Sequence, residues 1–341
     1  KKRNEFMSIQ EAYCIELGRV VSIIEARQEF LSQDISRRYS EYHFLCSTES
    51  CRAAGVKITG ACYKELPEEH KVSPYYKYSE KNNKPHCADC EWGIDKLKKY
   101  SGESDKEFKV RKSRAKLHDY IDEFQLLSSK NDEMMTKKAE NTATVAKTAS
   151  DSKNAIPKSD LLNKSPKIVK TSMLARLVEY YISARAQFGQ SDIWWELPLK
   201  VPGTSVSYLH EFFRKTKTAI AQQRFCVCIG DVKLKETESE FYFIFRKGFQ
   251  LAGTEIPIYV RITKKTFEQY RYRRMFRAQI DKNPYPEKFF KIYFIPKITD
   301  LSLKKVTDKQ GKDIGIYLFE IDDLSMVHLV NYSDLKKYVQ G

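Results

Sequence analysis

The chain of 341 residues carries 60 lysines and arginines against 45 aspartates and glutamates, which gives a formal net charge of +15. Hydrophobic residues make up 41% and aromatic residues 13%, a composition that excludes a disordered or collagen-like protein and suits two domains. The printed sequence contains no run of about 18 apolar residues and no secretory signal pattern, so we expect a cytoplasmic protein.

The excess of positive charge favours a polyanionic partner. Nucleic acid is the first candidate, an acidic membrane surface the second and an acidic protein the third. The simpler alternative is that like-charge repulsion keeps the protein soluble. We therefore expect nucleic acid as the main partner, leave a protein partner open, and expect no membrane. The sequence does not indicate the oligomeric state.

Residues 9–33 begin an N-terminal module over residues 1–127. Their apolar residues fall near helical spacing, which predicts a helix. Gly18 interrupts this pattern, so a short strand around residues 18–23 followed by a helix is the alternative. A cysteine-rich region comes next, and residues 116–127 predict the helix that ends the module.

The cysteine-rich region contains two short ligand pairs. Cys46 and Cys51 are five residues apart, and His86 and Cys90 are four apart. Two such pairs separated by a few dozen residues are typical of a structural zinc (Zn2+) site, and four protein ligands leave no position for substrate. Cys87 is a competitor because Cys87 and Cys90 have zinc-knuckle spacing, and Cys62 is a further spare thiol. Unrelated buried cysteines are the remaining alternative.

The segments "EYHFLCSTESC" and "SPYYKYSEKNNKPHCADC" resemble the small zinc-binding module of competence proteins of the CoiA type. The resemblance covers approximately residues 20–92 and implies a bacterial protein. It implies the same four ligands, with Tyr75 and Tyr76 packed beside them.

Members of that family often continue into a nuclease domain, which requires a metal-binding aspartate and a Glu-x-Lys triplet on neighbouring strands. The one triplet worth considering, Glu107-Phe108-Lys109, lies in a segment too charged for a buried strand. Asp231 has a better context but no triplet after it. A metal-dependent nuclease is therefore the alternative function and not the expected one.

Residues 128–170 contain no aromatic residue and few large aliphatic ones, which predicts a polar linker. The C-terminal module over residues 171–341 begins with predicted amphipathic helices at residues 172–188 and 207–223. Between them, Trp194 and Trp195 are interpreted as core or interface residues.

Beyond residue 223 the hydrophobic period changes from helical to alternating. Strands are predicted at residues 224–236, 240–249 and 256–262, followed by a helix at 265–280 and strands at 290–298 and 314–321. This is the element order of an OB-fold, a five-stranded partly open barrel that binds oligonucleotides. We therefore expect an α+β protein, with a zinc-stabilised N-terminal module and C-terminal helices beside an OB-like sheet or barrel.

The faces of these strands opposite the apolar face interleave aromatic and cationic residues. Bases stack on aromatic rings while cations contact phosphates, so this surface suits single-stranded nucleic acid. The alternative is that the tyrosines pack under neighbouring helices. The predicted contact residues on the strands are Tyr242, Arg246, Tyr259, Arg261, Lys291 and Tyr293.

The predicted helix at residues 265–280 adds a second basic surface. Tyr272, Met275, Phe276 and Ile280 form a packing stripe, which leaves four arginines outward. A solvated charged face is the usual fate of such a run, but these arginines lack a glutamate four residues later. The arginines predicted to contact nucleic acid are Arg271, Arg273, Arg274 and Arg277.

The sequence thus favours a non-catalytic protein that binds single-stranded or junction nucleic acid and contains a structural zinc site. The alternatives are the metal-dependent nuclease and a protein-protein interaction scaffold. No Walker loop, dinucleotide fingerprint or nucleophile-histidine pattern supports another chemistry.

Overall fold

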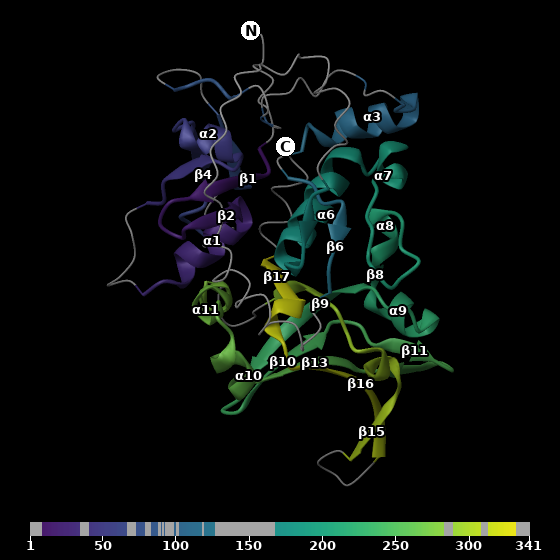
Figure 1. Ribbon diagram of the computed structural model, residues 1–341. Coiled ribbons are helices and arrows are strands. Elements are labelled where there is room, and N and C mark those ends of the chain that lie inside the picture. Colours follow the sequence, from purple (N-terminus) through teal and green to yellow (C-terminus); the bar gives the residue numbers. More distant parts are fainter. Residues whose placement is uncertain are drawn as a thin grey trace.

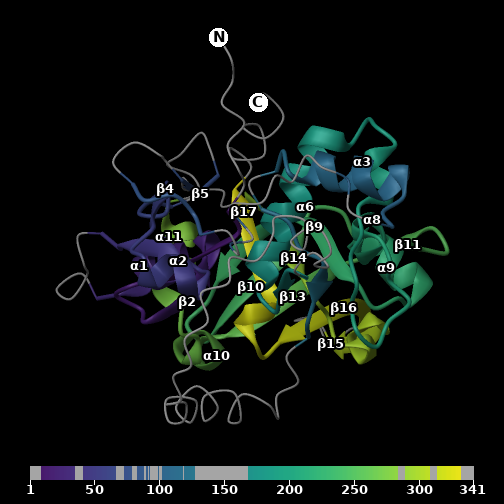
Figure 2. The ribbon, with the colours of Figure 1, turned by 45° about the horizontal axis from the view of Figure 1, so that its top comes forward.

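The computed structural model describes residues 9–34, 41–66, 73–78, 83–87, 90, 92, 99, 102–117, 119–126, 168–282, 289–307 and 313–331. Within these ranges the chain forms a small N-terminal sheet and a large C-terminal sheet, side by side (Figures 1 and 2). The predicted linker at residues 128–170 lies outside the described residues except for residues 168–170. The predicted boundaries of the two modules stay a prediction.

The N-terminal sheet is antiparallel, with the strand order β2-β1-β3-β4-β5. Gly18 has a φ of +65° in the turn between the first two strands, a conformation that glycine adopts without strain. The helix α1 follows at once, because the Ser22 side chain accepts a hydrogen bond from the Glu25 amide and caps it. Strands followed by a helix, the alternative in the sequence, are therefore confirmed. The elements are β1 (Glu11–Cys14), β2 (Arg19–Ser22), α1 (Ile23–Ser32), β3 (Phe44–Cys46), α2 (Glu49–Ala53), β4 (Lys57–Ala61) and β5 (Tyr75–Lys77).

The large sheet has the order β15-β16-β13-β10-β9-β14-β17, and β8 pairs with β9 as an eighth strand. All of its pairs are antiparallel except β13 with β16 and β8 with β9. The strands are β8 (Phe213–Lys215), β9 (Val227–Glu236), β10 (Glu240–Phe245), β13 (Ile258–Thr263), β14 (Phe289–Phe294), β15 (Lys304–Thr307), β16 (Asp313–Ile321) and β17 (Val327–Asn331).

This sheet contains the five predicted strands and is larger than predicted. Its inner face carries fully buried residues such as Phe243, Val260 and Ile292, as the alternating pattern requires. The rings of Phe294 on β14 and Phe319 on β16 are 5.1 Å apart although three strands lie between them, so the sheet curls strongly around its core. Among the described residues the pairing ends at β15 and β17, and no closed barrel forms.

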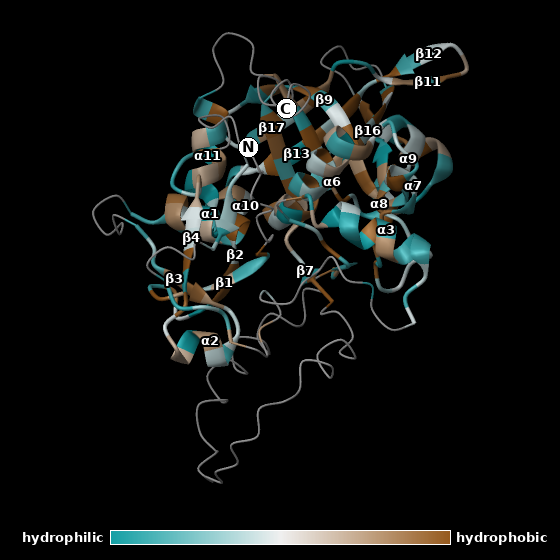
Figure 3. Ribbon diagram, turned by 90° about the horizontal axis from the view of Figure 1, so that it is seen from above, coloured by the Kyte–Doolittle hydropathy of each residue, from teal (hydrophilic) through white to brown (hydrophobic). Residues whose placement is uncertain are grey.

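The remaining elements surround the two sheets, and apolar residues concentrate on the central strands (Figure 3). The helix α3 begins with a capping box in which Ser104 and Glu107 bond each other's backbone amides. The other elements are α3 (Asp105–Arg114), β6 (Glu123–Phe124), β7 (Lys170–Thr171), α6 (Leu174–Phe188), α7 (Ile193–Glu196), α8 (Leu209–Phe212), α9 (Thr216–Gln222), β11 (Phe249–Leu251), β12 (Thr254–Ile256), α10 (Lys264–Gln269), α11 (Arg273–Asp281) and the 3-10 helices η3 (Ile298–Leu301) and η4 (Leu324–Met326).

Three helix predictions were wrong in part. Residues 116–127 contain the short strand β6, which pairs with β7. Residues 207–223 divide into α8, β8 and α9, because residues 213–215 pair with β9. The helix at 265–280 is interrupted at residues 270–272, where Arg271 and the Tyr272 hydroxyl bond to Glu29 of α1. The helix at 172–188 is confirmed as α6.

A buried ion pair joins α1, the helix beside the small sheet, to α6, a helix beside the large sheet. Arg27 of α1 donates to Glu179 of α6 at 2.5 Å, and both side chains are buried. His328 of β17 is also buried and interacts electrostatically with both groups. We call the small sheet with α1 and α2 the N-terminal layer, and the large sheet with α6 and its neighbouring helices the C-terminal layer. The Arg27–Glu179 pair therefore carries charge inside the contact between these two layers.

The buried His328 predicts a pH dependence of stability. Burial lowers its pKa from 6.5 to about 4, and Glu179 and Arg27 act in opposite directions. Because the unfolded chain binds a proton more readily, we expect the free energy of unfolding to fall by about 3 kcal/mol as the pH falls from 6.5 to 4. Urea denaturation across this range should show that loss, and His328→Phe should flatten it. An equal slope in the variant would contradict the assignment.

Candidate metal centre and basic cleft

The four predicted metal ligands lie together. Cys46 ends β3, Cys51 lies on α2, and His86 and Cys90 come from the segment after β5. Their ligand atoms all lie within 4.8 Å of one another, and the three thiols are fully buried. The cluster can therefore hold a metal ion.

Three separations between the ligand atoms fit one tetrahedral ion. The Cys46 Sγ lies 3.6 Å from the His86 Nδ1 and 3.6 Å from the Cys90 Sγ, and the Cys51 Sγ lies 3.7 Å from the His86 Nδ1. A tetrahedron with metal–sulfur bonds of about 2.3 Å and metal–nitrogen bonds of about 2.0 Å has edges of roughly 3.5–3.8 Å. The His86 Nδ1 to Cys90 Sγ distance, at 3.1 Å, is shorter than this.

The thiols of this cluster differ in protonation when no cation is bound, and a metal ion would have to displace protons from Cys46 and Cys51. A shared hydrogen bond lowers the pKa of Cys90 to about 3 and raises that of Cys46, while burial raises the pKa of Cys51 to about 12. Without a cation, only one of the three thiols is readily ionised at neutral pH. A metal ion would compensate the charge of three thiolates in this buried site.

The two competing cysteines are not part of the cluster. Cys87 contributes its backbone amide, which donates to the Cys51 Sγ at 3.1 Å, a hydrogen bond suited to a thiolate ligand. Cys62 has a φ of +60° and lies half-buried beyond β4. The structure thus favours the set of three cysteines and one histidine.

The predicted nucleic-acid residues of the strands lie on one face of the large sheet. Tyr242 is opposite Arg261 in the register of β10 and β13, and the alternation along the strands brings Tyr259, Lys291 and Tyr293 to the same outer face. Arg246 follows β10 directly and is exposed. Tyr293, however, is only 2% exposed because Tyr181 of α6 and Phe213 of β8 pack on it. This burial disfavours stacking of a base on Tyr293, which also lies in the lining of the cleft described below, and its contact with nucleic acid stays a prediction.

Carboxylates balance most of the other predicted cations. On β13, Arg261 pairs with Glu320 and Glu240. All four arginines of the predicted helix have partners: Arg271 with Glu29, Arg273 with Glu268, Arg274 with Asp34, and Arg277 with Glu236 and Asp281. Glu29 and Asp34 come from the N-terminal layer, so Arg274 of α11 and Arg271, which precedes α11, contact that layer.

A cleft of about 1380 Å³ opens beside the outer face of the large sheet, at the gap along β9 between its pairing with β8 and its pairing with β10. The pairing of β8 with β9 ends at Lys215 and Ile229, and that of β10 begins at Val232. Gly230 and Asp231 lie between these pairings and form part of the floor with Lys291 of β14.

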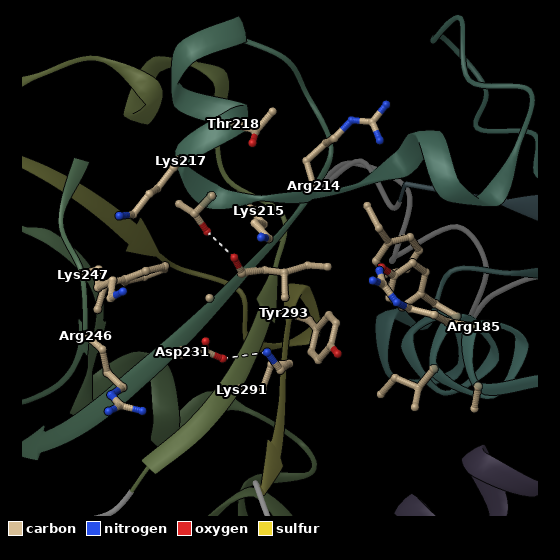
Figure 4. Close-up of a pocket in the computed structure, with 18 of the residues that line it drawn as sticks. Arg185, Arg214, Lys215, Lys217, Thr218, Asp231, Arg246, Lys247, Lys291 and Tyr293 are labelled. Atoms are coloured by element: carbon tan, nitrogen blue, oxygen red, sulfur yellow. Dashed lines mark hydrogen bonds and ion pairs between the residues drawn. The ribbon is translucent and has the colours of Figure 1, made fainter. Parts of the chain in front are cut away.

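The cleft gathers cations from five elements. In Figure 4, Arg246 and Lys247 lie across from Arg185 of α6, with the pair Asp231–Lys291 between them. Among the described residues that line the cleft, Asp231 is the one carboxylate, and its oxygen is 2.6 Å from the Lys291 Nζ. The seven cationic residues of the lining are Arg185, Arg214, Lys215, Lys217, Arg246, Lys247 and Lys291.

The sequence prediction included Arg246 and Lys291 from this set and missed the other five. Those five lie on α6, β8, α9 and the residue after Arg246, so no single segment shows their cluster. The short run "RKTK" at residues 214–217 was the one local signal.

In comparisons with family models, curated proteins and solved structures, no match to this chain was found. No helix in the described part of the chain is long and apolar enough to cross a membrane.

Proposed function

We propose that this protein binds nucleic acid without catalysis, through the basic cleft. The observation that carries the proposal is the composition of that cleft, seven cations against one carboxylate. Among the described residues, Lys215, Lys217, Arg246 and Lys247 have no ion-pair partner, in contrast to the four arginines of residues 271–277. Unpaired cations of this kind are available to phosphates.

The size of the cleft and its aromatic residues favour a nucleic acid over a simple anion. A volume of about 1380 Å³ exceeds that of a typical small-molecule pocket, about 300–1,000 Å³. Phe245, which is partly exposed, lines the cleft together with the cations, whereas Phe213 also lines it but is 4% exposed and stacks on Tyr181. Nucleic-acid grooves combine these two kinds of side chain.

The large sheet is proposed to be an OB-like unit. The strands β14, β9, β10 and β13 have the spatial order 4-1-2-3 of a Greek key, and β16 adds parallel to β13. The contact between Phe294 and Phe319 supports a partly open barrel. The cleft lies beside β9 and β14, the first and fourth strands in chain order. It does not lie on the face of β10 and β13, the second and third strands, where such folds bind oligonucleotides.

The metal of the cysteine cluster is proposed to be structural zinc. Three buried thiols and one imidazole form a soft ligand set, and four protein ligands leave no open position. The same set supports the proposed relation to the zinc module of CoiA-type proteins. A nuclease is less favoured, because Glu107 and Lys109 lie on α3 and not on a strand.

Charge reversal in the cleft tests the proposed function. We expect Lys215→Glu/Lys247→Glu to weaken binding of labelled DNA and RNA oligonucleotides at least about tenfold. The slope of log affinity against log salt should fall by about 1.4–1.8 for two lost phosphate contacts. Fluorescence anisotropy at several salt concentrations measures both quantities.

The control is Lys265→Glu/Lys305→Glu, which makes the same charge change at exposed lysines outside the cleft. Equal weakening by both variants would show that only net charge matters. Absence of binding by the unmodified protein at low salt would contradict the proposed function and favour an interaction scaffold for an acidic protein.

A further inference from the structure

Three aromatic side chains form a shelf on the surface near the cleft: Trp195, Tyr208 and His210. The Trp195 side chain is 58% exposed and Tyr208 is 39% exposed. The Trp195 ring meets the His210 ring edge-on at 4.9 Å, and the Tyr208 ring stacks near the same imidazole at 5.9 Å. We call these three residues the aromatic shelf.

The fold holds the shelf in place from below. Trp194, the neighbour of Trp195 on α7, is 6% exposed and packs on Tyr181 at 5.6 Å. Because Trp194 turns inward on this short helix, Trp195 turns toward solvent. Tyr208 precedes α8 and forms a backbone bridge with Pro198, so the loop carrying it is fixed as well.

One hydrogen bond links the shelf to the basic cleft. Arg214 lines the cleft, and its guanidinium donates to the His210 carbonyl at 2.9 Å. Arg214 therefore belongs to the cleft lining and also contacts the backbone of one shelf residue. The Tyr181 ring, on which Trp194 packs, also lines the cleft.

The charges near the shelf do not oppose a polyanion strongly. Glu196 pairs with Lys106 at 3.2 Å, and Glu211 accepts the backbone amides of Ser207 and Tyr208. Burial lowers the pKa of His210, so the imidazole is mainly neutral at pH 7 and offers a ring face and not a charge. The shelf is thus an uncharged aromatic surface with Arg214 as its link to the cleft.

We propose that the aromatic shelf stacks unpaired bases of a single strand whose phosphates lie in the basic cleft. This inference rests on the proposed function and assigns its ligand class as single-stranded nucleic acid. In a duplex the ring faces of the bases are covered by their neighbours, so a duplex can contact the cations but not the shelf. A protein partner of the shelf is the competing interpretation, and the experiment separates the two.

The test uses the intrinsic fluorescence of the protein. Trp92 and Trp194 are 3% and 6% exposed, so an added ligand meets Trp195 alone among the three tryptophans. We expect oligo(dT) of about 16 nucleotides, the upper site size of one OB unit, to quench the emission. Trp195→Phe should remove most of the quenching and keep most of the binding, measured by anisotropy of the labelled oligonucleotide.

Affinity measurements supply the second readout. Trp195→Ala and Tyr208→Ala should each weaken binding of oligo(dT) between about fivefold and one-hundredfold, and leave binding of a duplex of equal length unchanged. Ile298→Ala, which alters another exposed apolar side chain outside the cleft, is the matched control. Thermal unfolding of each variant verifies that the fold is retained.

The outcomes distinguish the two proposals. If oligo(dT) does not bind the unmodified protein, the proposed function fails, and the shelf assignment falls with it. If oligo(dT) binds and the cleft variant weakens it, but Trp195→Ala does not and no quenching occurs, the shelf assignment alone is overturned. Equal losses for duplex and single strand would also overturn it.

Discussion

Replacing Cys46 with serine is expected to abolish stoichiometric binding of the proposed zinc ion and to unfold the N-terminal layer. The apparent binding free energy of structural zinc in small modules is about 10–16 kcal/mol, and it becomes folding free energy where the ligands lie in one site only after folding. Cys46 belongs to β3, the central strand of the N-terminal sheet, so its loss affects the core around Phe44. Elemental analysis measures the metal content, and circular dichroism measures the fold.

Trp92 offers a local readout of this change. It is 3% exposed, and its indole nitrogen donates to the Ser47 hydroxyl at 2.7 Å, one residue after a ligand. We expect its emission to shift to longer wavelength when Cys46→Ser is made or when a strong chelator removes the metal. The background Trp194→Phe/Trp195→Phe makes Trp92 the sole reporter.

Cys87→Ser is the matched control for the ligand set. Cys87 contributes its backbone amide to Cys51, and a serine retains that amide. The Cys87→Ser variant should therefore keep one equivalent of zinc and an unchanged emission spectrum. Loss of zinc from Cys87→Ser, or its retention by Cys46→Ser, would show that the ligands are a different set.

The metal cluster and the cleft differ in how far the sequence predicts them. Zinc ligands come in short pairs on tight turns, so the spacing of Cys46 with Cys51 and of His86 with Cys90 indicated the cluster directly. The cleft depends on the gap between the part of β9 that pairs with β8 and the part that pairs with β10. The sequence did not show β8, because residues 213–215 lie inside a stretch with helical periodicity.

The charged surfaces show a second limit. The four arginines of residues 271–277 lack a glutamate four residues later, and from sequence alone this favoured contact with phosphate. Two of them have partners about 240 residues away in the chain, Arg271 with Glu29 and Arg274 with Asp34. Only tertiary structure separates cations that are already paired from those in the cleft. Likewise, the sequence gives no reason to distinguish the two adjacent tryptophans, but Trp194 is buried and Trp195 is exposed.

Replacing Arg27 with methionine is expected to lower the free energy of unfolding by about 3–5 kcal/mol. Arg27 is 2% exposed, and its removal leaves the Glu179 carboxylate in the contact between the layers without the guanidinium. Burying a charge without its partner is far more costly than losing an exposed ion pair. Urea denaturation at pH 7.5, where His328 is neutral, measures the effect.

Two further variants separate burial from charge pairing. The double substitution Arg27→Met/Glu179→Leu removes both charges and should recover most of the lost stability, since apolar side chains of similar volume replace a buried pair with little penalty. Arg274→Met breaks a pair that also joins the two layers but is half exposed on both sides, and it should change stability by at most about 1 kcal/mol. If Arg274→Met matched Arg27→Met, burial would not be the cause.

The buried His328 makes the effect of Arg27→Met depend on pH. In the native protein Arg27 disfavours protonation of His328, whereas Glu179 favours it. Once Arg27 is methionine, the His328 imidazole can take up a proton and replace the guanidinium as the positively charged partner of the Glu179 carboxylate. The stability deficit of Arg27→Met relative to the unmodified protein should therefore shrink as the pH falls from 7.5 toward 5, and His328→Phe in the same background should abolish that recovery. A deficit that stays constant with pH would show that His328 does not replace Arg27 as the partner of Glu179.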